Sequence, residues 1–301
     1  MTDLTNPIYS DANKAREHLE ALRWPYGPVC PHCGTFDRIT KLAGKSTRPG
    51  VYKCNACAKP FTVTVGTIFE DSKIPLNKWL LAFRLLNSAK KGFSAHELHR
   101  DIGITYKSAW FMAHRIREAM KGDGSPLGGP GTVVEADEAF VGGKKRNRLS
   151  GNVAPKKKVL ALVERGGTAR SFHIANIHAN TIRSALVTNV HRASTLMTDE
   201  ARVYRIVGKE FASHGHTLHA GRVFAKGDTH SNSAENFFSI LKRGVIGTYH
   251  HWSEAHMHRY LVEFDWRYSN RALSDSDRTI EAIKGARGKR LMYRQPSSLA
   301  A

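Results

Sequence analysis

Four cysteines in the first fifth of the chain constrain its fold more than any other feature. They form two pairs, Cys30-Pro-His-Cys33 and Cys54-Asn-Ala-Cys57, with twenty residues between the pairs. This spacing suits one tetrahedral Zn²⁺ ion, because each short turn supplies two thiolates and the loop between them lets the pairs converge. Four protein sulfurs leave no open position on the metal, so we expect a structural zinc ribbon. The alternative is two disulfides or four unrelated thiols, and a reducing cytoplasm disfavours the disulfides.

Periodicity and composition indicate a multidomain protein of the α+β class. The stretch KGDGSPLGGPG is rich in glycine and proline and marks the clearest domain boundary. The expected segments are an N-terminal helix (1–25), the zinc ribbon (26–68), a helical domain (69–120), a linker (121–131), a C-terminal α/β domain (132–275) and a basic tail (276–301).

The net charge indicates what kind of partner the protein has. Lys+Arg 46 against Asp+Glu 26 gives +20 at pH 7, which predicts attraction to a polyanion, most simply nucleic acid. A cationic protein that is merely soluble is the alternative. The N-terminus lacks a signal-peptide pattern, and the longest apolar runs, such as WLLAF, are far shorter than a membrane helix. We therefore expect a soluble cytoplasmic protein without membrane contact.

Residues 94–120 have the pattern of a helix-turn-helix unit. Ser94 and Glu97 can form a capping box for one helix, Gly103 ends that helix, and Thr105 can cap the next. The buried angle is expected from Leu98, Ile102, Ile104, Ala109 and Trp110. The outward face is expected from Tyr106, Lys107, Ser108, Phe111, His114 and Arg115. Such a face could read a DNA groove, although three helices can also pack together without touching DNA.

The stretch TVVEADEAFVGGKK starts as an apolar strand and then carries three acids, Glu135, Asp137 and Glu138. Side chains alternate between the two faces of a strand, so Glu135 and Asp137 share one face and Glu138 takes the other. Asp137 and Glu138 are therefore not expected to serve one site unless the strand ends or bulges between them.

Two further acids are candidates for a catalytic or metal-binding role. Asp199 follows an apolar strand, where α/β sheets gather active groups, and Glu235 falls in the first turn of a helix. With Asp137 they form a set with gaps of 61 and 35 residues, an oxygen-ligand site suited to two Mg²⁺ or Mn²⁺ ions. Lys242 lies seven residues after Glu235, about two helical turns, and so shares its face. Taken singly, each acid also fits a solvated strand end or a helix cap.

Several stretches of the chain resemble the DDE transposases of bacterial insertion sequences of the ISXO2-like family. They are DEAFVGGK (137–144), MTDE (197–200) and the long block 230–271, while CPHCG and residues 52–86 resemble the zinc-ribbon leader of that family. The resemblance implies an RNase H-like catalytic domain, with a mixed sheet flanked by helices. It also implies a metal-binding triad at Asp137, Asp199 and Glu235, and a DNA contact for Lys242. The family commonly has threonine where this chain has Ala139.

The order of the expected elements agrees with such a domain. Strands are expected at 133–141, 159–164, 169–177 and 195–198, and helices at 181–190, 233–243 and 254–268.

The resulting prediction is a DNA transposase that binds terminal inverted repeats and performs two-metal phosphodiester hydrolysis and strand transfer. The alternatives are a zinc-ribbon, helix-turn-helix regulator without catalysis and an RNase H-like nuclease that never joins strands. Residues expected to touch DNA are Tyr106, Lys107, Ser108, His114, Arg115, Lys144, Lys145, Arg146, Lys242 and Arg243. A homo-oligomer on DNA is expected because two element ends must meet.

Overall fold

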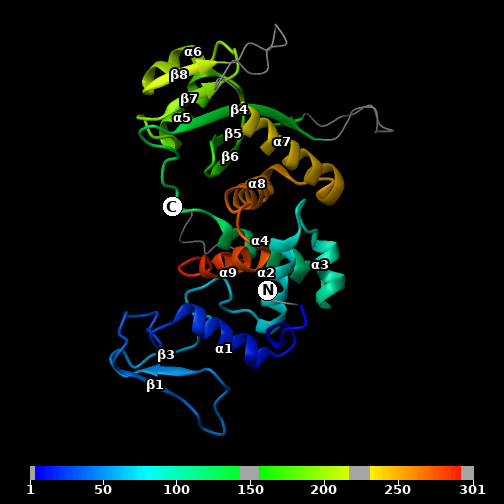
Figure 1. The fold of residues 1–301 in the computed structure, drawn as a ribbon. Coiled ribbons are helices and arrows are strands. Elements are labelled where there is room, and N and C mark those ends of the chain that lie inside the picture. Colours follow the sequence, from blue (N-terminus) through cyan, green and yellow to red (C-terminus); the bar gives the residue numbers. More distant parts are fainter. Residues whose placement is uncertain (1–3, 143–155, 217–230, 293–301) are drawn as a thin grey trace. The chain divides into compact units, whose positions relative to one another are not determined.

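The computed structural model describes residues 4–142, 156–216 and 231–292 (Figure 1). These residues form two compact units. The first contains residues 4–89, 93–120 and 273–292, and the second contains residues 90–92 and 121–272 without the undescribed segments. No helix of the described residues is both long and apolar enough to cross a membrane.

The first unit begins with a helix and a small antiparallel sheet. The 3₁₀ helix η1 (Pro7–Tyr9) leads into α1 (Ala12–Arg23), whose N-terminus is capped because the Asp11 carboxylate accepts from two backbone N–H groups. The strands β1 (Ile39–Lys41), β2 (Tyr52–Cys54) and β3 (Pro60–Phe61) follow in that order in the sheet. The aromatic rings of Trp24, Tyr52 and Phe61 pack together with centroids 5.4 to 5.8 Å apart. This cluster stabilises a sheet that is too small to have a core of its own.

The helical part of the first unit contains the expected helix-turn-helix elements. Its helices are α2 (Leu76–Ser88), α3 (Ala95–Ile102), α4 (Tyr106–Met120) and α9 (Asp275–Lys284). The Ser94 hydroxyl accepts from the Glu97 N–H, and Gly103 ends α3 in the left-handed conformation at φ 61°. The Thr105 hydroxyl accepts from the Ser108 N–H at the start of α4. The caps predicted at Ser94, Gly103 and Thr105 are thus confirmed.

The C-terminal residues differ from the expected tail. Residues 276–301 were expected to be a basic tail, yet Asp275–Lys284 forms α9, which packs on α2 and α4. The Ser274 hydroxyl caps this helix by accepting from the Asp277 N–H, and Ala282 and Ile283 are buried. Beyond it, the Lys289 ammonium donates to the Ala119 carbonyl at 2.9 Å. The basic residues suggested a tail, but the segment forms a short amphipathic helix. The apolar side of this helix is covered by residues far away in the sequence.

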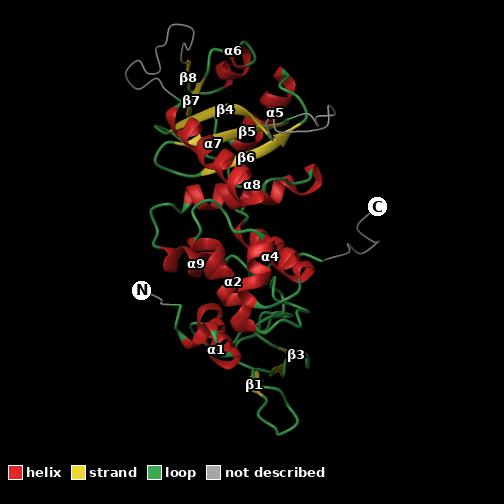
Figure 2. Cartoon of the chain, turned by 90° about the vertical axis from the view of Figure 1, so that its right-hand side faces the viewer, coloured by secondary structure: helices red, strands yellow, loops and turns green. Residues whose placement is uncertain are grey.

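The second unit is built on a five-stranded mixed sheet. Its strands are β4 (Val133–Val141), β5 (Lys157–Glu164), β6 (Ala169–Ile174), β7 (Thr195–Thr198) and β8 (Ser213–His216). The order is β6-β5-β4-β7-β8, with β4 antiparallel to β5 and parallel to β7. Figure 2 shows these strands side by side in yellow. The five residues 159–163 of β5 are all fully buried, as expected for a strand covered on both faces.

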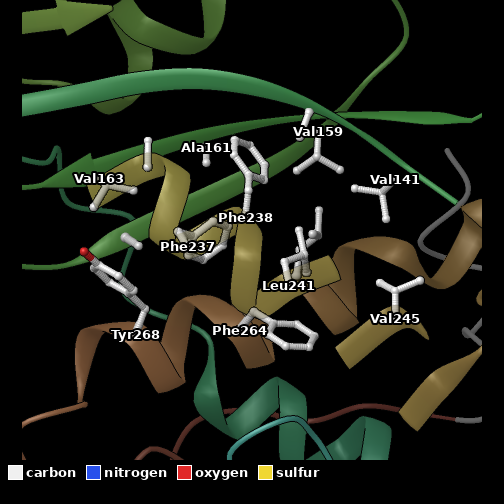
Figure 3. Close-up of a cluster of buried hydrophobic side chains, with 14 of the residues drawn as sticks. Val141, Val159, Ala161, Val163, Phe237, Phe238, Leu241, Val245, Phe264 and Tyr268 are labelled. Carbon is white, nitrogen blue, oxygen red and sulfur yellow. The ribbon is translucent and has the colours of Figure 1, made fainter. Parts of the chain in front are cut away.

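Helices cover both faces of this sheet. They are α5 (Ala179–Asn189), α6 (Tyr204–Val207), the 3₁₀ turn η3 (Gly208–Glu210), α7 (Asn232–Gly244), the π-helical turn η5 (Val245–Tyr249) and α8 (Glu254–Ser269). On one face, α7 and α8 pack through Phe237, Leu241 and Phe264 against Val159, Ala161 and Val163 (Figure 3). On the other face, α5 and α6 pack against Val134, Ala136, Leu160 and Leu162. Odd-numbered residues of β4 therefore face α7, and even-numbered ones face α5 and α6.

Candidate active site and zinc centre

The four cysteines meet at one point beside the small sheet. The Sγ atoms of Cys30 and Cys57 lie 3.8 Å apart, and those of Cys33 and Cys54 lie 3.6 Å apart. Sulfurs bound to one tetrahedral Zn²⁺ at about 2.3 Å lie about 3.8 Å from each other, so the arrangement fits a zinc ion. A disulfide requires about 2.05 Å, and all four cysteines are free. The donor set and its geometry favour structural zinc over the disulfide alternative.

A group of acidic side chains that could hold a metal ion lies where β7 ends beside β4. Carboxylate oxygens of Asp137, Glu138 and Asp199 lie within 4.8 Å of one another. Asp137 and Glu138 are in the middle of β4, and Asp199 directly follows β7. Oxygens on opposite sides of a Mg²⁺ ion lie about 4.2 Å apart, so small side-chain movements would suffice to bring all three onto one ion. The donor set, all carboxylate oxygen, matches Mg²⁺ or Mn²⁺.

The meeting of Asp137 with Glu138 corrects the expectation that neighbouring strand residues serve different sites. The strand neither ends nor bulges, because the pairing with β5 is continuous from Val134 to Val141. However, β7 pairs with β4 only at residues 133–135 and ends at Thr198. The edge of β4 is therefore open at positions 137 and 138, and side chains from both faces can reach the same point beside that edge.

A buried tyrosine holds Glu138 in this position. The hydroxyl of Tyr204, which is fully buried in α6, donates to Glu138 Oε1 at 2.5 Å. Burial raises the pKa of the Glu138 carboxyl to about 7, and the neighbouring charges of Asp199 and Asp137 add to this rise. Neither Glu138 nor Tyr204 was predicted to belong to the site. The adjacent acids Asp137 and Glu138 were visible in the sequence, but nothing near Tyr204 indicated that its hydroxyl binds Glu138.

Glu235 lies on the same side of the sheet as Asp137 but outside the close acidic group. It is exposed in the first turn of α7, and the Ser231 hydroxyl donates to its carboxylate at 3.5 Å. Among the described residues, the group of three acids within 4.8 Å does not include it. Lys242 and Arg243 are exposed at the end of the same helix, with the Lys242 ammonium 6.0 Å from the Phe238 ring centroid.

The proposed groove-reading face is only partly exposed. Tyr106 and Lys107 are exposed, and Ser108 is half-buried. The outward orientation expected for His114 and Arg115 is wrong, because both side chains are buried. Both lie in the second half of α4, which packs against α2 and α9. The Arg115 guanidinium donates to the Glu70 carbonyl at 2.6 Å and lies over the Trp79 ring. The expected DNA contacts Lys144, Lys145 and Arg146 lie outside the described residues.

Comparisons with known proteins find similarity over the regions that contain these two groups of side chains. Residues 126–269 match the ISXO2-like transposase domain, and residues 10–60 match the transposase zinc-ribbon domain. A relative from Halobacterium salinarum, described as an uncharacterized protein in transposable element ISH50, is 28% identical over 249 residues. That similarity covers 76% of this chain and 82% of the relative. The crystal structure of a pre-cleavage Mos1 transpososome is 13% identical and covers 94% of each chain with a TM-score of 0.29, too low to support a structural argument.

Proposed function

Since this chain belongs to the ISXO2-like DDE transposases and carries their N-terminal zinc ribbon, we propose that it moves an insertion sequence. In this proposal it binds the terminal inverted repeats, hydrolyses a phosphodiester bond there and joins the freed 3′-OH to target DNA. The observation that supports it best is the convergence of Asp137 and Asp199 from two neighbouring parallel strands.

The proposed catalytic residues are Asp137, Asp199 and Glu235, which would hold two Mg²⁺ or Mn²⁺ ions. Glu138 adds a further carboxylate beside the first two. When bound, such ions lower the pKa of a water or hydroxyl and stabilise the leaving oxygen of an in-line displacement. The protein supplies fixed carboxylates and, through the buried Tyr204 hydroxyl, the orientation of Glu138. In this proposal Lys242, which is exposed near the end of α7, would contact a DNA phosphate or a terminal base.

The proposed DNA surface follows from charge and exposure. The chain carries a net charge of +20, and exposed Tyr106 and Lys107 start helix α4 next to half-buried Ser108. The sequence adds further proposed DNA contacts at Lys144, Lys145, Arg146 and Arg243. The buried His114 and Arg115 would instead stabilise the packing of α4. Two element ends must be joined to one target, so we also propose an oligomer on DNA.

A metal titration on a labelled terminal-repeat duplex tests this function. We expect no nicking without divalent cation, and nicking followed by strand transfer when Mg²⁺ or Mn²⁺ is added. A DNA-binding regulator would show no dependence on divalent cation and no product. A nuclease that cannot join strands would nick the duplex but leave a supplied target plasmid unjoined. Either result would contradict the transposase proposal.

The exposed start of α4 gives a second expected result. We expect Lys107→Ala to weaken binding to specific and unrelated duplexes alike, because a lysine bound to phosphate carries no sequence information. A plot of the logarithm of the binding constant against the logarithm of the salt concentration has a negative slope. The loss of one phosphate contact should make this slope shallower by about 0.9. Fluorescence anisotropy at several salt concentrations measures this slope. Lys14→Ala, an equally charged change at an exposed position of α1, serves as the matched control. An unchanged slope for Lys107→Ala would remove this lysine from the DNA surface.

A further inference from the structure

The strand that carries Asp137 has another acid on the same face, and this acid is fully buried. Glu135 lies two residues before Asp137 in β4 and has no exposed surface. Carboxylates are rarely buried unless they are paired and hydrogen-bonded, so its partners indicate what it does.

The partners of Glu135 lie far away in the sequence, in the first turn of α7. Its Oε2 atom accepts from the backbone N–H groups of Ser233 at 2.8 Å and Ala234 at 3.0 Å. Its Oε1 atom accepts from Nε of Arg165 at 2.7 Å. Both carboxylate oxygens are thus used, one on the helix and one on the guanidinium.

Glu135 takes the place of a local helix cap. The first N–H groups of a helix have no partner within the helix and normally need a capping side chain. The N-cap residue of α7, Ser231, makes no side-chain capping bond. A negative charge at a helix N-terminus also interacts favourably with the helix dipole. The start of α7 is therefore fixed by a side chain from the central strand of the sheet.

This contact joins two parts of the proposed catalytic triad. Asp137 is two residues along the strand from Glu135, and Glu235 directly follows Ala234 in the helix. We propose that Glu135 is a positioning residue that sets where Glu235 stands relative to Asp137. The inference rests on the proposed function, because it assigns Glu135 a role only if Glu235 binds the catalytic metal.

The chemistry of the contact requires a carboxylate of this length. A glutamine at position 135 has one acceptor oxygen, which can serve either α7 or Arg165 but not both. The side-chain NH₂ group of the glutamine would then face the donor that its oxygen does not serve, so that two donors would oppose each other. An aspartate keeps both acceptors but is shorter by one methylene, so it cannot span the same distance without moving the helix.

The anchoring is tested by amide hydrogen exchange on the full-length Glu135→Gln and Glu135→Asp variants. We expect the amides of Ser233 and Ala234 to exchange at least tenfold faster in both variants. Glutamine replaces the charged acceptor by a neutral one, and aspartate is too short to reach these N–H groups unless the helix moves. Amides in the middle of α8 should be unaffected. Glu254→Gln is the matched control, since Glu254 is also an acid in the first turn of a helix, α8, but is exposed. Unchanged exchange at residues 233 and 234 in the folded variants would overturn the anchor.

The positioning role is tested by the Mg²⁺ concentration that gives half-maximal nicking. Mg²⁺ demands near-ideal octahedral geometry, so a displaced Glu235 should raise this concentration at least tenfold in both Glu135 variants. A purely structural role would reduce the amount of active protein without moving the midpoint. DNA affinity measured without metal should stay within about twofold of wild type, since none of these atoms is part of the proposed DNA surface.

The outcomes separate this inference from the proposed function. If the wild-type protein nicks DNA and the Glu135 variants show an unchanged Mg²⁺ midpoint, Glu135 has no positioning role and the transposase proposal stands. If the wild-type protein does not nick DNA with any divalent cation, both proposals fail. If only Glu135→Asp folds, its exchange and its Mg²⁺ midpoint decide the matter alone.

Discussion

Replacing Asp199 by asparagine is expected to abolish strand nicking while DNA binding persists. The substitution removes one negative charge and one anionic oxygen from the group formed with Asp137 and Glu138. We expect a fall in the nicking rate on the order of 10³-fold, equivalent to about 4 kcal/mol of transition-state stabilisation. Single-turnover nicking of a labelled terminal-repeat duplex measures the rate, and anisotropy without metal measures binding.

The fold should tolerate this change, which makes the result interpretable. Asp199 Oδ1 accepts from the Ala201 N–H at 3.0 Å, and an asparagine oxygen can accept the same bond. Asp123→Asn is a matched control, because Asp123 Oδ1 accepts from the N–H two residues on, Ser125, at 2.9 Å in the linker. The control should nick at the wild-type rate. Nicking by Asp199→Asn at that same rate would remove Asp199 from the catalytic group.

Replacing Cys54 by serine is expected to release the zinc ion and unfold the ribbon. Cys54 is fully buried in β2, and its sulfur is 3.6 Å from that of Cys33. A structural zinc site contributes an apparent binding free energy of about 10–16 kcal/mol at neutral pH, most of which depends on a complete set of thiolates. Zinc content of the purified protein should fall from one ion per chain to none. Amide exchange should accelerate across residues 26–68.

A histidine in the first cysteine turn provides the control for this experiment. His32 lies between Cys30 and Cys33 and is exposed. His32→Ala should keep one zinc per chain, because four sulfurs already complete a tetrahedral site. Full zinc content in Cys54→Ser, or loss of zinc in His32→Ala, would show that the ligand set is not the four cysteines.

The helix-turn-helix unit shows how far a local pattern predicts a structure. Caps at Ser94 and Gly103 were predicted because capping depends on residues within one helical turn. The outward face was predicted well only for Tyr106 and Lys107, at the start of α4. Farther along the helix, exposure depends on what packs against it. Helix α9, more than 150 residues away in the sequence, packs against α4, and no pattern near His114 could indicate that.

The acids of β4 show the same limit at the site itself. Alternation along the strand correctly predicted which face each acid takes, since odd residues face α7 and even residues face α5 and α6. It did not predict that Asp137 and Glu138 meet, because that depends on where the neighbouring strand β7 ends. The alternation also did not predict a hydrogen-bond partner for Glu135, because the N–H groups from which Glu135 accepts lie about 100 residues later.

The sequence by itself determined the four-cysteine cluster suited to zinc, the caps at Ser94 and Gly103, the order of β4 to β7 with helices α5, α7 and α8, and the presence of three well-spaced acids. These features depend on covalent spacing and on contacts within a few residues. Only the tertiary structure decided how the three acids of one strand are divided. One is buried against α7, while the other two meet Asp199 at an open strand edge. The reason is physical: a side chain's exposure and partners depend on which distant elements pack beside it, and the local sequence does not encode them.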